Sequence, residues 1–171
     1  MERGTEKIRT IAIAGHGQSG KTTLIENLAA ITGAIPRAET VASGKTLSDY
    51  TPEEIERKIS IYSALASMHW NDTLINFWDT PGASDFIGEV IAAFRSAEAG
   101  LMVLDGRAGV QIETIKYWRD LDRRNKPRLV FVNKMDEDRA DFERAVQDIK
   151  TQFNADVFPV TFPIGKGAEL T

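Results

Sequence analysis

Residues 15–22, Gly-His-Gly-Gln-Ser-Gly-Lys-Thr, constrain the fold of this chain more than any other feature. They match the pattern G-x-x-x-x-G-K-[ST] and lie between a short apolar run, Ile8–Ala14, and a helical pattern, Lys21–Ile31. In such a strand–loop–helix unit the backbone N–H groups converge on phosphate oxygens at the positive end of the helix dipole. A glycine turn that merely caps a structural helix is the alternative. The flanking strand and helix favour the phosphate-binding loop.

This loop supplies most of the candidate nucleotide contacts. We expect Lys21 to reach the β- and γ-phosphates, which makes it a candidate catalytic residue as well, and the Thr22 hydroxyl to bind Mg²⁺. The expected nucleotide-binding residues are Gly15, His16, Gly17, Gln18, Ser19, Gly20, Lys21, Thr22 and Thr23.

A second motif, Asp-Thr-Pro-Gly at residues 79–82, follows an apolar run at 74–78. Asp79 is placed to hold the metal through water, and the Gly82 N–H to meet the γ-phosphate, so that Gly82 is the second candidate catalytic residue. The pattern D-x-x-G is common by chance. An ordinary strand-to-helix turn with Asp79 as a cap therefore stays open for this motif taken alone.

A third motif, Asn-Lys-Met-Asp at residues 133–136, follows the apolar run 129–132. The Asp136 carboxylate can accept hydrogen bonds from the N1–H and exocyclic amine of guanine, which adenine does not offer. Asn133 is expected to tie this loop to the phosphate loop, and the Lys134 stem to lie over the base. A charged strand-to-helix turn is the alternative for this motif alone, but the three motifs in this order predict a GTPase.

The remaining pattern predicts an α/β fold. Strands are expected at residues 59–68, 74–78, 101–104, 129–132 and 157–162, and helices at 84–98, with Ser84 as N-cap, 112–124 and 141–153. The strands at 59–68 and 74–78 are joined by a short turn at 71–73, which predicts a hairpin, and residues 32–50 read as a long loop. We therefore predict a P-loop NTPase fold, a doubly wound, mostly parallel sheet with one antiparallel edge strand.

Composition limits the possible partners. The chain has 171 residues, 21 basic against 25 acidic, and no cysteine, which excludes thiolate metal sites and disulfides. The net charge of −4 argues against direct nucleic-acid binding by this domain alone. No apolar run approaches the ~18 residues that span a bilayer, so we expect no membrane partner and a cytoplasmic protein.

Five short motifs resemble the G domain of elongation factor G and its relatives. They are Gly-His-x-x-x-Gly-Lys-Thr-Thr (15–23), Asp-Thr-Pro-Gly-x-x-Asp-Phe (79–86), Gly-Val-Gln (109–111), Phe-Val-Asn-Lys-Met-Asp (131–136) and Phe-Pro-Ile-Gly (162–165). The tetracycline ribosome-protection proteins share most of these motifs. The resemblance implies GTP/GDP and Mg²⁺ as ligands, and the ribosome as partner of the full-length protein.

The chain departs from that family's pattern at informative positions. Ala83 stands where the family has the histidine credited with positioning the attacking water, and Gln18 where it usually has Asp. The switch-I sequence Arg-Gly-Ile-Thr-Ile is Arg-Lys-Ile-Ser-Ile here (57–61), so Ser60 keeps the hydroxyl that the resemblance assigns to Mg²⁺. These changes indicate a divergent elongation factor G-like paralogue.

Three functions remain open at this stage: a ribosome-dependent GTPase, a GTP-binding switch with little or no hydrolysis, and a ribosome-protection protein. Ala83 favours the switch, whereas the retained Lys21, Thr22 and Asp79 favour the enzyme. The family's guanine-loop Ser-Ala motif is not found. We therefore expect residues 1–171 to be one G domain, truncated before that motif and before the family's inserted subdomain.

The third motif predicts that the protein binds guanine nucleotides in preference to adenine nucleotides. Guanine nucleotides are expected to outcompete adenine nucleotides by about 10⁴ or more, because the wrong base leaves a buried carboxylate unpaired. Asp136→Asn is expected to weaken GTP binding and favour xanthosine triphosphate, whose C2 carbonyl accepts a hydrogen bond from the new amide. Competition titrations on the full-length protein measure both effects, and equal binding of ATP and GTP contradicts the assignment.

Overall fold

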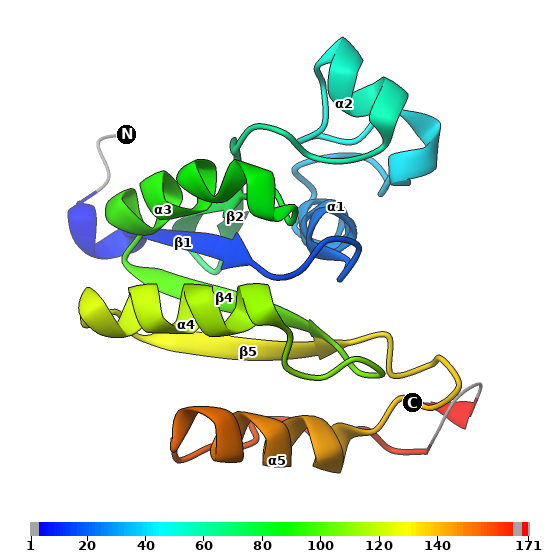
Figure 1. The fold of residues 1–171 in the computed structure, drawn as a ribbon. Coiled ribbons are helices and arrows are strands. Elements are labelled where there is room, and N and C mark those ends of the chain that lie inside the picture. Colours follow the sequence, from blue (N-terminus) through cyan, green and yellow to red (C-terminus); the bar gives the residue numbers. More distant parts are fainter. Residues whose placement is uncertain (1–3, 166–168, 171) are drawn as a thin grey trace.

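The computed structural model describes residues 4–165 and 169–170. In this part of the chain five strands form one sheet in the order β2-β3-β1-β4-β5 (Figure 1). The strands are β1 (Ile8–Ala14), β2 (Ala64–Trp70), β3 (Thr73–Asp79), β4 (Ala99–Asp105) and β5 (Arg128–Asn133). β1 lies parallel to β3 and β4, β5 is parallel to β4, and β2 is antiparallel to β3. The carboxyl ends of four strands therefore meet at one edge of the sheet.

Helices cover both faces of this sheet. The helices among the described residues are α1 (Lys21–Ile31), α2 (Pro52–Arg57), α3 (Ile87–Ser96), α4 (Ile112–Arg123) and α5 (Phe142–Phe153), with short 3₁₀ turns η1 (Thr5–Lys7), η2 (Val41–Ser43) and η3 (Ser84–Phe86). Helix α2 lies away from the sheet (Figure 1). Because successive strand residues point to opposite faces, Ala12 packs with α3 and α4, whereas Ile13 packs with α1. α5 joins α4 through the stacked rings of Trp118 and Phe153, whose centroids are 4.1 Å apart. The predicted doubly wound α/β fold with one antiparallel edge strand is confirmed.

The antiparallel strand β2 begins later than the sequence predicts. Residues 59–63 were expected in the strand, but β2 starts at Ala64. The Glu54 carboxylate accepts hydrogen bonds from the N–H groups of Ile61 at 3.0 Å and Tyr62 at 3.1 Å. These N–H groups are bound to a side chain, which explains why the ladder begins beyond them.

Two further predictions are wrong. Ser84 does not cap the third long helix, because it begins η3, and α3 follows with Phe86 as its N-cap residue and no side-chain cap hydrogen bond. Residues 157–162 form no strand. Pro159 has no N–H to donate to a ladder, and the flanking side chains of Phe158 and Val160 are exposed.

Helix α2 was missed: it lies between the expected loop at residues 32–50 and the expected strand at 59–68. Its start carries a capping box, in which the Thr51 side chain accepts from the Glu54 N–H and the Glu54 carboxylate accepts from the Thr51 N–H at 3.1 Å. Pro52 occupies the first helical position. The pattern T-P-x-E is a recognisable helix start, so this element could have been found from the sequence.

None of the helices among the described residues combines the length and apolar character that crossing a membrane requires.

The packing of α3 against the sheet generates a stability prediction. Phe94 is 0% exposed and meets Tyr117 edge-on, with centroids 6.2 Å apart. Phe94→Ala is expected to lower the free energy of unfolding by about 3–5 kcal/mol through lost burial and the cavity left behind. Phe158→Ala is the matched control, because this ring is 83% exposed, and it is expected to change stability by less than about 0.5 kcal/mol. Urea unfolding compares the two variants, and equal midpoints contradict this core assignment.

Candidate functional site

The phosphate-loop candidate connects the end of β1 to the start of α1, at the carboxyl edge of the sheet. Gly20, the N-cap residue of α1, has φ +95°, a left-handed conformation that favours glycine. A Cβ at this position would lie 2.2 Å from Asn133 Nδ2. The Ser19 N–H donates to the His16 carbonyl at 3.2 Å and closes the turn within the loop.

Lys21 is a buried cation at the mouth of this loop. The residue is 5% exposed, and its Nζ donates to the carbonyls of Gly15 and His16, both at 3.0 Å. Burial lowers the pKa of Lys21 to about 8, against the attraction of Asp79 and Asp49. A Cβ at Gly82 would lie 2.5 Å from Lys21 Nζ. The backbone of Gly82 in the second motif therefore lies close to the Lys21 ammonium group.

The three candidate metal ligands are close together. Thr22 Oγ1 donates to Asp79 Oδ2 at 2.9 Å and lies 3.4 Å from Ser60 Oγ. Asp79 is 1% exposed, and its Oδ1 has no hydrogen-bond partner among the described residues. Burial raises the pKa of the Asp79 carboxyl, against hydrogen bonds from Ser48 and Thr22 and the attraction of Lys21.

This donor set fits Mg²⁺. The cluster offers only oxygen ligands, and Mg²⁺ prefers one or two protein oxygens together with phosphates and water to an all-protein cage. The described part of the chain contains no group of three or more His, Cys, Asp or Glu side chains that could hold a metal.

Sequence reasoning missed two residues of this cluster. Ser48 Oγ donates to Asp79 Oδ2 at 2.6 Å, and Asp49 lines the same cavity as Thr22 and Ser60. Burial raises the pKa of the Asp49 carboxyl, and a hydrogen bond with Ser60 opposes this shift. A Ser-Asp pair in a polar loop has no periodicity or spacing that marks it, so no sequence signal pointed to these residues.

The third motif is tied to the phosphate loop as expected. Asn133 Nδ2 donates to the Ser19 carbonyl at 2.9 Å. Lys134 lines a cavity of about 640 Å³ together with the phosphate loop, Ser60 and Gly82. Asp136 lies outside this cavity and lines the neighbouring one, of about 1080 Å³, which Lys134 also borders. Lys134 therefore separates the phosphate end of the site from the carboxylate that is expected to bind the base.

Ala83 faces the phosphate cavity without a polar side chain. The same cavity is lined by His16, Ser84 and Glu113. His16 Nδ1 is 2.7 Å from Glu113 Oε2, which ties the phosphate loop to the first turn of α4. The other histidine, His69, lies in β2 and does not line the cavity.

The fold and these loops define a P-loop nucleotide-binding domain, and the comparisons with known proteins agree. The family described as the elongation factor Tu GTP binding domain matches residues 6–169, and the chain belongs to that family.

Individual relatives are similar over nearly the whole chain. Ribosome-releasing factor 2, mitochondrial, of Anopheles gambiae is 38% identical over 165 residues, 96% of this chain and 22% of that protein. Elongation factor G of Granulibacter bethesdensis is 41% identical over 160 residues, 94% of this chain and 23% of that protein. The crystal structure of ttk003000868 from Thermus thermophilus superposes with a TM-score of 0.91 at 34% identity, covering 96% of this chain and 24% of that one. The chain thus spans less than a quarter of the length of these relatives.

The buried Lys21 generates a pH prediction. Its pKa is lowered to about 8 in the free protein, and a bound phosphate raises it by attraction. At pH 8 binding of GDP is therefore expected to take up about half a proton, and affinity to fall by up to about tenfold per unit as the pH rises further.

Calorimetry in buffers of different ionisation enthalpy measures this uptake. Lys21→Arg is the control, because a guanidinium keeps its proton in this range. GDP binding at pH 8 without proton uptake contradicts the assignment of Lys21 to the phosphates.

Proposed function

We propose that this chain is the GTP-binding and GTP-hydrolysing domain of an elongation factor G-like translation factor that acts on the ribosome. The observation that carries the proposal is the hydrogen bond from Asn133 to the Ser19 carbonyl at 2.9 Å. It joins the loop that carries Asp136 to the phosphate loop. One ligand with a guanine base and phosphates can therefore occupy both ends of the site. Family membership supports the same conclusion.

The positions of the site residues support the roles proposed for them. The phosphate loop, residues 15–23, binds the phosphates through its N–H groups, and Lys21 adds the buried charge. Asp136 accepts hydrogen bonds from guanine, and the Gly82 N–H contacts the γ-phosphate beside Lys21.

The hydroxyls of Thr22 and Ser60 would hold Mg²⁺, and the carboxylate of Asp79 would hold it through water. Bound Mg²⁺ supplies charge neutralisation for phosphoryl transfer. The buried, unpaired Oδ1 of Asp79 supports this role, because an acceptor at such a place is otherwise costly.

A GTP-binding switch with little or no hydrolysis is the second candidate. Ala83 favours it, because a methyl group neither orients nor polarises water. The polar side chains that share the cavity with Ala83 include His16, Ser84 and Glu113, and His16 is held by Glu113. Single-turnover hydrolysis by the full-length protein, with and without ribosomes, separates the two candidates. Ribosome-stimulated hydrolysis supports the enzyme, and bound GTP that stays intact supports the switch.

The proposed partners are a guanine nucleotide and, through the full-length protein, the ribosome. The net charge of −4 supports a domain that does not bind nucleic acid by itself.

We propose a cytoplasmic location for this protein. The names of several relatives place those proteins in mitochondria. We propose one G domain over residues 1–171, supported by the family match at 6–169.

The residue at position 83 provides the sharpest kinetic prediction. Ala83→His in the full-length protein is expected to raise the ribosome-dependent single-turnover rate at least about tenfold, since a placed acid–base group is worth ~10²–10⁴. GTP affinity is expected to stay unchanged. Ala83→Leu is the control, because it adds bulk without a proton-transferring group.

If the wild type hydrolyses as fast as relatives with histidine and Ala83→His adds nothing, another group positions the water. Ser84, or the ribosome itself, is then the first alternative to examine.

A further inference from the structure

We propose that Asp105 is a positioning residue for base recognition, which acts by holding Lys134 and so fixes the loop that carries Asp136. This inference rests on the proposed function, in which the loop of residues 133–136 binds guanine. Asp105 lies in none of the three motifs. It is the last residue of β4 and pairs in register with Asn133, the last residue of β5.

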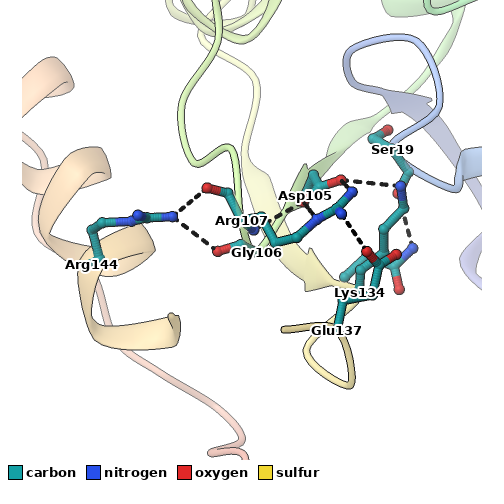
Figure 2. Close-up of polar contacts among 8 residues, drawn as sticks. Ser19, Asp105, Gly106, Arg107, Lys134, Glu137 and Arg144 are labelled. Atoms are coloured by element: carbon teal, nitrogen blue, oxygen red, sulfur yellow. Dashed lines mark hydrogen bonds and ion pairs between the residues drawn. The ribbon is translucent and has the colours of Figure 1, made fainter. Parts of the chain in front are cut away.

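The first contact is an ion pair between the end of β4 and the loop after β5. Asp105 is 8% exposed, and its Oδ2 lies 3.0 Å from Lys134 Nζ (Figure 2). Lys134 has φ +59°, a left-handed conformation that is unfavourable for a residue with a long side chain. Such a conformation persists only where the surroundings hold it. The ion pair at one end of Lys134 and the Asn133–Ser19 hydrogen bond beside it supply that hold.

Arg107 makes the second contact. It binds Asp105 and also Glu137, the residue that follows Asp136. Its N–H donates to Asp105 Oδ1 at 2.9 Å, and its Nη2 lies 3.3 Å from Asp105 Oδ2. Its Nη1 lies 2.6 Å from Glu137 Oε2. Asp136 therefore stands between two residues, Lys134 and Glu137, whose side chains end on Asp105 and Arg107. The backbone that carries Asp136 is therefore held through residues on both sides of it.

The backbone of the β4–α4 loop is also joined to the segment after β5. The Gly106 N–H donates to the Asn133 carbonyl at 2.8 Å, and the Asp141 N–H donates to the Gly106 carbonyl at 3.1 Å. Arg144 of α5 donates to the carbonyls of Gly106 and Arg107, as Figure 2 shows. A Cβ at Gly106 would lie 2.7 Å from Met135 Sδ, so the two loops are in close contact. The support for Lys134 is thus itself rigidly held.

The charge on Asp105 is present throughout the useful pH range. Burial acts to raise the pKa of its carboxyl, but hydrogen bonds from the Arg107 side chain and N–H and from Lys134 hold this pKa well below its usual range. Asp105→Asn therefore removes a real charge while it nearly preserves the shape of the side chain. This makes the substitution a clean probe of the ion pair.

The test compares GDP with inosine diphosphate, which lacks the exocyclic amine that Asp136 is proposed to bind. Wild-type full-length protein is expected to prefer GDP by about tenfold or more, since a hydrogen bond to a charged group is lost in the analogue. Asp105→Asn is expected to weaken GDP binding about tenfold and inosine diphosphate binding less. The GDP preference then shrinks several-fold. A role in stability alone leaves this preference unchanged, since both ligands share the phosphates and ribose.

Asp120→Asn is the matched control. Asp120 is a 4% exposed carboxylate of α4 that pairs with Arg123 at 2.8 Å and Arg124 at 2.6 Å. Its loss is expected to lower stability and leave the GDP preference unchanged. If Asp105→Asn does not fold, Arg107→Gln serves in its place, because the partly exposed Arg107 side chain is more easily replaced. Arg107→Gln is expected to reduce the preference for GDP over inosine diphosphate, but by less than Asp105→Asn does.

Two negative outcomes are distinguishable. If wild type prefers GDP to inosine diphosphate and the folded variant keeps the same preference, the role of Asp105 is overturned and the proposed function stands. If wild type binds GDP no better than ADP, the guanine assignment of this loop fails, and the role of Asp105 fails with it.

Discussion

The fold is organised around two buried opposite charges at the carboxyl ends of neighbouring strands. β1 and β3 are in parallel register, with Ile13 opposite Asp79, and Lys21 begins the helix that follows β1. Burying an ammonium and a carboxylate is expensive unless other groups compensate. Here carbonyls of the phosphate loop accept from Lys21, and the hydroxyls of Thr22 and Ser48 donate to Asp79. The sheet centre therefore carries polar groups that a phosphate and a cation would satisfy further.

Acidic side chains hold the segment between α1 and β2 in place. The buried Glu26 carboxylate of α1 accepts from the N–H groups of Glu39 at 3.0 Å and of Leu47. Glu54 binds the N–H groups of Ile61 and Tyr62 in the same manner. Carboxylates thus hold part of the backbone that carries Ser48 and Ser60 to the site, and Ile35 of the same segment packs against the core. Such a segment can change its conformation without opening the main core.

The sequence predicts those parts of the site that are encoded locally. The phosphate loop, the Asp79 turn and the tie from Asn133 all follow from residue types at fixed spacing after a strand. Glu54 shortens β2 by binding N–H groups seven and eight residues away, a contact that no strand pattern contains. Residues 157–162 alternate like a strand, but Pro159 interrupts the hydrogen bonding. The Asp105–Lys134 pair arises only from the register of β4 on β5, since each residue alone reads as an ordinary loop charge.

Strand β5 forms the second edge of the sheet, opposite β2, and its side chains affect how the chain can contact other molecules. Within the described residues β5 pairs with β4 alone, and its residues 128–133 line the cavity of about 1080 Å³ together with α5 and residues 154–163. Leu129 and Phe131 are 63% and 40% exposed on this strand. Exposed edges of this kind recruit strands from other molecules, and charged side chains are the usual protection. Here the Arg128 side chain is turned back onto Trp118 and Asp122, so its charge does not protect this apolar edge strand against pairing with another molecule.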